Sequence, residues 1–225
     1  MMTNLFSIFD PSTSIMSMKI NWMTSIIVMS MLPSTYWMMN NRYMIMLSTP
    51  LKMMDKEFKM LINLKNNKGT TLMFTSILFM IMLNNLMGLF PHMFTSTSHL
   101  TMTLTMALPM WMSFMLFGWT KNTKNMFIHL VPTGTPSVLM PFMVCIESIS
   151  NIIRPGTLAV RLAANMIAGH LILTLLGNTT MNMEINILPF MLIIQMLLLM
   201  LETAVAIIQG YVFAVLSILY ASEVN

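Results

Sequence analysis

Long apolar runs that are nearly free of charge constrain this chain more than any other feature. Only 8% of its 225 residues are charged and 56% are hydrophobic, whereas soluble domains carry roughly 25% charged residues. A membrane-spanning helix needs ~20 consecutive apolar residues, and several such runs occur here. The runs lack the period-2 alternation of barrel strands, so their backbone hydrogen bonds must close within helices. The sequence therefore predicts an all-α integral membrane protein with a single domain.

The apolar runs and the polar breaks between them predict the order of segments. We expect a short lead over 1–14, apolar helices that span the membrane over 20–39, 70–90 and 100–119, an amphipathic helix over 43–64, and a C-terminal hairpin of two long helices over 137–177 and 187–220. The hairpin helices are longer than one membrane crossing requires, which indicates a steep tilt. Pro155 and Gly156 are expected to interrupt the first of them.

Charged side chains gather mainly outside the long runs. Between 43 and 64, charges such as Lys52 interleave with apolar residues such as Phe58 at helical spacing, which is typical of a helix lying in the membrane interface; a solvated loop helix is the alternative. Region 52–68 holds five lysines and loop 120–131 holds two. Basic loops stay on the cytoplasm-like side, so we expect both segments and the C-terminus inside, and the N-terminus outside.

Several functional classes find no support in the residue types. The basic residues stand between apolar runs, so the net charge of +4 does not indicate nucleic-acid binding. Cys145 is the sole cysteine, which excludes an internal disulfide and a cysteine-based metal site. No phosphate loop, nucleophile motif or zinc pattern occurs, so no cofactor or metal is expected.

Two smaller features bear on the origin of the chain. The 33 methionines have no ligand-like spacing, so codon bias of an organellar genome explains them better than copper ligation or a soft, adaptable surface. The first residues include Asp10 and no basic region, and they are expected to be neither a secretory signal nor a transit peptide.

Polar side chains form a line along each of the two hairpin helices. On the first, Glu147, Arg154 and Arg161 are spaced by seven residues, so they drift by only about 20° per step around the helix. On the second, Glu202 and Gln209 are again seven apart. Arginine at membrane depth costs a contested ~2.5–3.5 kcal/mol on insertion scales, so Arg161 is a functional candidate; the alternative is an arginine that snorkels to the headgroups.

A hairpin that turns near 178–186 sorts these groups by depth. His170 and Glu202 fall on the outer half, Glu147 and Glu223 on the inner half, and Arg161 and Gln209 between them. Carboxylates and histidines can exchange protons near neutrality, whereas an arginine stays charged and repels a proton. This order indicates two offset proton half-paths separated by a cation. The alternative is that the groups simply pair to hold helices together, for example Glu147 with Arg154.

Several stretches resemble subunit a of the F-type ATP synthases in its mitochondrially encoded form. They are LAVRLAANMIAGH at 158–170, ESISNIIRPGTLAVRL at 147–162, NNLMGLFP at 84–91, LETAVAIIQGYVFAVLSILY at 201–220 and TNLFSIFDPST at 3–13. The resemblance covers essentially the full length. Its most specific part is an Arg-x-x-x-Asn-x-x-x-Gly core followed downstream by Glu and Gln.

The resemblance implies a stator protein of the mitochondrial inner membrane that clasps a rotating ring of c-subunits. Peripheral-stalk subunits, small membrane subunits and the lipid bilayer would be its other partners. The implied roles are Arg161 facing the ring carboxylates with Asn165 and Gln209 nearby, His170 and Glu202 on the path from the intermembrane space, and Glu147 and Glu223 on the matrix path.

Under this resemblance the chain moves protons and catalyses no covalent chemistry, because ATP forms on a separate soluble head. Two other classes stay open at this point. One is another polytopic proton-handling subunit of a respiratory complex, which would be expected to carry buried lysines, although no lysine lies inside a predicted span. The other is a purely structural membrane scaffold.

Overall fold

The computed structural model describes residues 5–12, 18–30, 39, 41–62, 69–91, 93–131, 136, 138–181, 183–184 and 186–224. All regular structure in these ranges is helical, which confirms the predicted all-α class. The α-helices are α1 (Thr24–Ser30), α2 (Arg42–Ile62), α3 (Thr70–Gly88), α4 (Leu100–Lys121), α5 (Thr123–His129), α6 (Met140–Thr180) and α7 (Leu188–Val224). Three short 3-10 helices are η1 (Leu5–Phe9), η2 (Ile20–Met23) and η3 (Ser96–Ser98). Within the described residues, α3, α4, α6 and α7 are long and apolar enough to cross a membrane.

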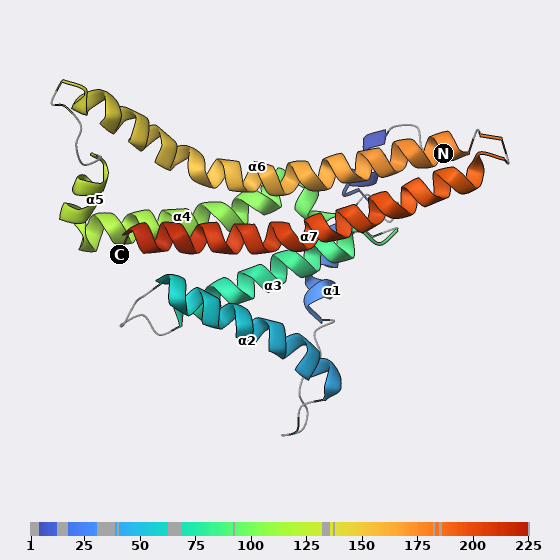
Figure 1. Cartoon of the computed structure of the whole chain (residues 1–225), viewed down its shortest axis with the longest axis horizontal. Coiled ribbons are helices and arrows are strands. Elements are labelled where there is room, and N and C mark those ends of the chain that lie inside the picture. The colour runs from blue at the N-terminus through green and yellow to red at the C-terminus, as the bar shows by residue number, and fades with distance from the viewer. Residues whose placement is uncertain are drawn as a thin grey trace.

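Helices α6 and α7 form the predicted long hairpin and run side by side along the molecule (Figure 1). Helix α6 has 41 residues, which at 1.5 Å per residue is about 60 Å, twice the ~30 Å hydrocarbon core. The expected interruption at Pro155 and Gly156 is wrong, because α6 continues through both residues. A proline removes one helical hydrogen bond and favours bending, and α6 is visibly curved in Figure 1.

Helices α3 and α4 pack against this hairpin and supply its support. Helix α3 lies along α7, and α4 contacts both α6 and α7. One apolar cluster joins α3 and α4 to the last turns of α7 through side chains such as Phe74, Met110 and Ile218. A second cluster joins α3 and α4 to the middle of both hairpin helices through Ile81, Leu158 and Phe213. The hairpin is therefore covered on the α3–α4 side and open on the other.

Helix α2 carries the predicted amphipathic pattern, and its apolar side packs against other helices. Phe58 is fully buried (0% exposed) in the cluster that contains Ile218 of α7. Helix α5 contacts α4, and His129 lines a cavity together with Glu223. The two basic segments of the sequence thus lie near the same end of α7. That arrangement agrees with the charge argument that puts them on one side of the membrane.

The N-terminal part is described only in pieces. The predicted span over 20–39 is helical over Ile20–Ser30, and residues 31–38 lie outside the described residues. Helix α1 packs against α3. Within the predicted lead of 1–14, the 3-10 helix η1 packs against α6, whereas residues 1–4 and 13–14 lie outside the described residues.

Candidate functional site

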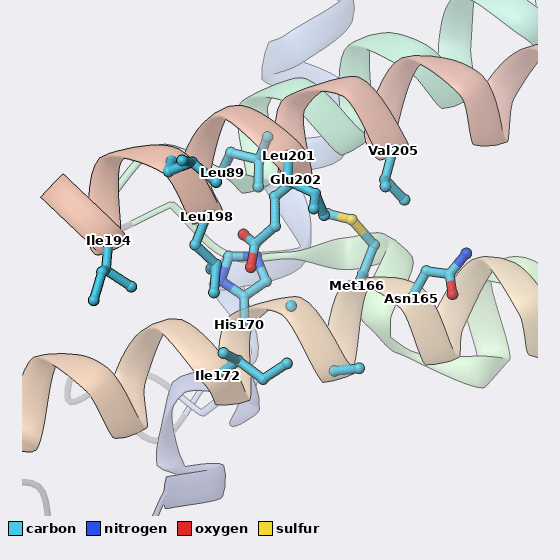
Figure 2. Close-up of a pocket in the computed structure, with 13 residues that line it drawn as sticks. Leu89, Asn165, Met166, His170, Ile172, Ile194, Leu198, Leu201, Glu202 and Val205 are labelled. Atoms are coloured by element: carbon cyan, nitrogen blue, oxygen red, sulfur yellow. The ribbon is translucent and has the colours of Figure 1, made fainter.

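The outer cluster consists of His170 on α6 and Glu202 on α7. The two side chains point toward one another across the hairpin (Figure 2). Glu202 is only 9% exposed. Within the described part of the chain, both Glu202 carboxylate oxygens and His170 Nε2 are buried without a hydrogen-bond partner. A buried polar group without a partner is costly, so each such group requires an explanation.

A cavity of about 470 Å³ adjoins the outer cluster. His170, Glu202 and Asn165 supply its polar lining, and apolar side chains such as Leu198 and Val205 supply most of the rest (Figure 2). Isolated ionisable groups in such a lining are typical of functional pockets rather than of packing. Asn165 contributes to the same cavity lining, and its amide points away from His170 and Glu202 (Figure 2).

Gly169 permits the close approach of α6 and α7 at this point. A Cβ built on Gly169 would lie 2.8 Å from Glu202 Oε1 and 2.9 Å from its carboxyl carbon. Any side chain here would push the carboxylate away from its observed place. In the sequence, Gly169 is visible only as the last residue of the Arg-x-x-x-Asn-x-x-x-Gly motif. Its position next to His170 is the one local sign that another helix could approach α6 closely there.

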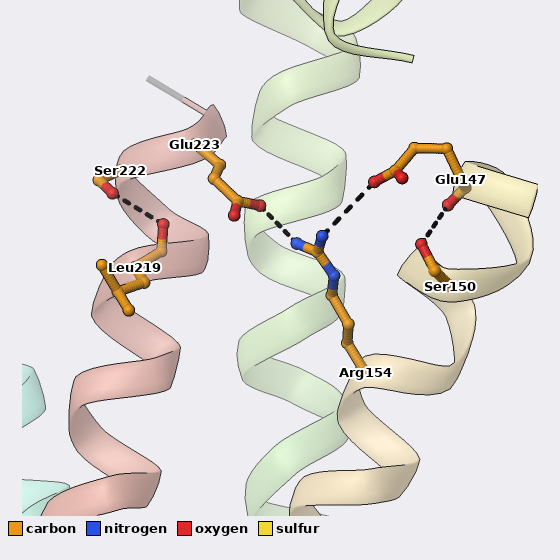
Figure 3. Close-up of polar contacts among 6 residues, drawn as sticks. All are labelled: Glu147, Ser150, Arg154, Leu219, Ser222 and Glu223. Carbon is orange, nitrogen blue, oxygen red and sulfur yellow. Dashed lines mark hydrogen bonds and ion pairs between the residues drawn. The ribbon is translucent and has the colours of Figure 1, made fainter. Parts of the chain in front are cut away.

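The inner cluster is built around Arg154 of α6 (Figure 3). Its Nη2 donates to Glu147 Oε1 at 3.4 Å, and its Nη1 donates to Glu223 Oε2 of α7. The guanidinium carbon also lies 4.9 Å from the centre of the Tyr220 ring, within the range of a cation–π contact. The alternative pairing of Glu147 with Arg154 is therefore present in the structure. The second pairing, to Glu223, was not foreseen.

Arg161 differs from both clusters, since its side chain is exposed on a long apolar helix. No hydrogen bond or ion pair joins it to another residue in the described part of the chain. Exposed residues on the same face of α6 include the small side chains Thr157, Ala164 and Ala168. Small residues on a membrane helix allow another helix to approach closely. Arg161 thus lies on an exposed face of α6 that a second helix could approach closely.

Buried amides and hydroxyls in α3 and η3 add a polar region that the sequence reasoning missed. Asn85 is fully buried, and its Nδ2 donates to the carbonyl of Ala206, one turn beyond Glu202, at 3.4 Å. Its Oδ1 and Thr97 Oγ1 have no partner among the described residues. Residues 84–91 were used only for the resemblance, because an asparagine in an apolar run does not by itself reveal its neighbours. Gln209 on α7 is half-buried.

The described residues contain no group of three or more histidine, cysteine, aspartate or glutamate side chains that could hold a metal ion. The site is thus a set of acid, amide and guanidinium groups, arranged along the hairpin in the order Glu147, Arg154, Arg161, Asn165 and His170. From Arg161 the helix rises about 10 Å to Arg154 and about 13 Å to His170. Such an arrangement can exchange protons at two places and keep a fixed positive charge between them.

Comparison with known proteins shows the family to which this chain belongs. The model of the family described as ATP synthase A chain matches residues 13–222. The chain is 62% identical over 226 residues to ATP synthase subunit a of Aedes aegypti, and 60% identical to the proteins of that name from Anopheles gambiae and Drosophila melanogaster over 226 and 225 residues. Each alignment covers 100% of both chains. With a match of this extent, and with the specific motif and hairpin described above, the chain belongs to the ATP synthase A chain family.

Proposed function

We propose that this chain conducts protons through two offset half-channels where it meets the rotating c-ring of a mitochondrial ATP synthase, and so couples proton flow to rotation and ATP synthesis. The observation that carries the proposal is Arg161, a cation on an exposed apolar face that makes no ion pair with the described residues, with a protonatable cluster on either side of it. Family membership supports the same role, and it removes support from the alternative of another respiratory-complex subunit.

In the proposed mechanism a proton enters by the outer cluster. His170 and Glu202 receive it, because their buried heteroatoms have no fixed partner among the described residues and can accept or donate one. The proton then neutralises a carboxylate on the ring, which turns through lipid. Arg161 attracts each returning ionised carboxylate and blocks a direct passage, because its guanidinium does not deprotonate. Asn165 and Gln209 are the polar neighbours of this passage.

The proton leaves past Glu147 and Glu223 toward the matrix. The inner location of these carboxylates is supported by the cavity that Glu223 lines together with His129 of the basic loop, by the arginine that Glu147 and Glu223 share, and by the positive-inside rule. Four apolar helices among the described residues and the family support a multi-pass protein of the mitochondrial inner membrane. From the distribution of the basic loops we place the N-terminus toward the intermembrane space and the C-terminus toward the matrix. The chain itself forms no covalent bond with the substrates of ATP synthesis. Peripheral-stalk and small membrane subunits would hold it in place as a stator.

Cysteine crosslinking in native membranes tests this proposal. Cys145, which is free and exposed, is first replaced by serine, and a cysteine is then placed at Val160, the exposed neighbour of Arg161. A matched control is a cysteine at Met46, which is exposed on α2. We expect Val160→Cys to crosslink to a cysteine at the carboxylate level of the ring subunit and Met46→Cys not to do so.

Crosslinks from Val160→Cys that reach only other helices of this chain would make Arg161 a structural charge. The scaffold alternative would then replace the proposal.

A further inference from the structure

The outer end of the hairpin is covered by the N-terminal turn η1, which the proposed mechanism leaves without a role. The turn packs against α6. Its last residue, Phe9, is half-buried and lies with its ring edge-on to the imidazole of His170, at a centroid distance of 6.2 Å and an interplanar angle of 83°. This is the edge-to-face geometry that aromatic pairs prefer. The first residues of the chain thus contact one of the two groups of the outer cluster.

Phe9 is itself held by His99. The Nε2–H of His99 donates to the backbone carbonyl of Phe9 at 2.8 Å. The His99 ring in turn contacts Phe94, at a centroid distance of 5.2 Å, and Trp22, at 5.3 Å, and these two rings also contact each other. Three segments that are distant in sequence therefore meet at one point. These contacts hold the backbone of the N-terminal turn at Phe9 in a defined place.

His170 needs a support of this kind for a chemical reason. An imidazole that takes up and releases protons cannot be oriented by a permanent partner on the nitrogen that exchanges them. No hydrogen bond fixes Nε2 of His170, or either carboxylate oxygen of Glu202, among the described residues. The orientation of the ring must then come from packing, and a group misplaced by about 1 Å can react up to about 100-fold more slowly.

We propose that Phe9 is a positioning residue for the outer proton path, fixed by His99, and that it keeps the His170 imidazole turned toward Glu202. This inference rests on the proposed function, and it requires that the N-terminal turn stays in the mature protein. The neighbouring Asp10 remains exposed.

The chain offers a matched control in the same turn. Phe6 is 65% exposed, so Phe6→Ala removes the same ring from η1 without touching the outer cluster. The intact complex is used, in membranes of a host in which this chain replaces the resident subunit. Two quantities are measured, namely the rate of proton flux and the rate at which diethyl pyrocarbonate modifies His170, read by peptide mass spectrometry. His129 on α5 is the internal reference for the reagent.

With Phe9→Ala we expect proton flux to fall about tenfold, within the range for a misplaced reacting group, and modification of His170 relative to His129 to rise several-fold. Phe6→Ala should change neither. Phe9→Leu, which keeps most of the apolar volume, should give an intermediate result and serves as the deciding variant if Phe9→Ala prevents assembly.

Unchanged flux and unchanged His170 reactivity in the Phe9 variants would overturn the inference, as would a mature chain that begins after Phe9 by mass spectrometry. Arg161→Ala separates this failure from failure of the proposed function. If Arg161→Ala abolishes coupled flux while the Phe9 variants do not alter it, only the positioning role falls. If Arg161→Ala leaves flux intact, the proposed function falls first.

Discussion

The two ends of the α6–α7 hairpin contain similar side chains but satisfy them in opposite ways. At the inner end, Arg154 binds both Glu147 and Glu223, and the side chains remain 25–39% exposed. At the outer end, Nε2 of the half-buried His170 and both carboxylate oxygens of the buried Glu202 are inaccessible and have no hydrogen-bond partner within the described residues. The comparison teaches that similar carboxylates on one hairpin can be satisfied by a shared arginine at one end and left without a partner in the described part of the chain at the other. Five experiments break or sharpen this contrast.

The largest effect is expected from removing the cation between the two ends. Arg161→Ala should reduce coupled proton flux at least about 100-fold, which is the size typical for loss of one preorganised electrostatic group. Assembly should be nearly normal, because Arg161 makes no ion pair with the described residues. ATP-driven proton pumping and a native gel measure both quantities. Coupled pumping that survives the change would refute a separating role.

The next largest effect is expected when one carboxylate at each end of the hairpin is neutralised. Glu202→Gln should slow proton flux by about 10- to 100-fold, since a positioned proton-exchanging group contributes about 10²–10⁴-fold. Glu223→Gln should slow it by no more than about fivefold, because a partly exposed ion pair contributes only about 0–1 kcal/mol. Passive flux through membranes stripped of the soluble head measures the two variants side by side. Equal effects at both ends would erase the contrast.

The contact at Gly169 tests whether the outer end depends on close packing. Gly169→Ala would place a Cβ 2.8 Å from Glu202 Oε1, and overpacking of this kind costs about 1–3 kcal/mol. We expect slower flux and a lower melting temperature of the complex. Gly177→Ala on the same helix meets no atom within 4 Å and should leave both unchanged. Identical behaviour of the two variants would contradict the packing argument.

A smaller effect is expected from releasing the inner end. Arg154→Gln removes both ion pairs, which are partly exposed, so the free energy of unfolding should fall by no more than about 2 kcal/mol. Proton flux should fall less than in Glu202→Gln. Thermal release of the subunit on native gels and passive flux measure the two quantities. A loss of flux as large as that of Glu202→Gln would show that the inner pairing is needed for transport itself.

The smallest effect is expected at the exposed ion pair between Lys59 and Asp55 on α2. The hydrogen bond from Lys59 is the main reason that the pKa of Asp55 lies below its ordinary value of 3.8. A depressed pKa stabilises the fold above the unfolded-state pKa, and this contribution is lost as pH falls through the folded-state pKa. Lys59→Gln should raise the Asp55 pKa toward 3.8, measured by a carboxyl NMR titration, and Lys56→Gln should not. An unshifted titration in Lys59→Gln would disprove the attribution.

Much of the architecture followed from the sequence, because the relevant physics is local. The long apolar runs with few charges required membrane helices, and their length required the hairpin that α6 and α7 form. The spacing of seven residues placed Glu147, Arg154 and Arg161 on one side of α6 before any neighbour was known. The prediction that Pro155 and Gly156 interrupt the first hairpin helix is wrong, because α6 continues through both residues, where Pro155 is buried and α6 packs against α4.

Only the tertiary structure decided which groups meet and which remain alone. Helical periodicity fixes the direction of a side chain around its own axis, but the partner depends on how neighbouring helices are aligned. Because of that alignment, Arg154 forms an ion pair with Glu223, Gly169 lies close to the Glu202 carboxylate, and Arg161 is exposed. It also brought Phe9 to His170 across 161 positions of sequence, a contact for which no local pattern exists. The sequence thus determined the helices and the chemistry they carry, and the packing determined where that chemistry is paired.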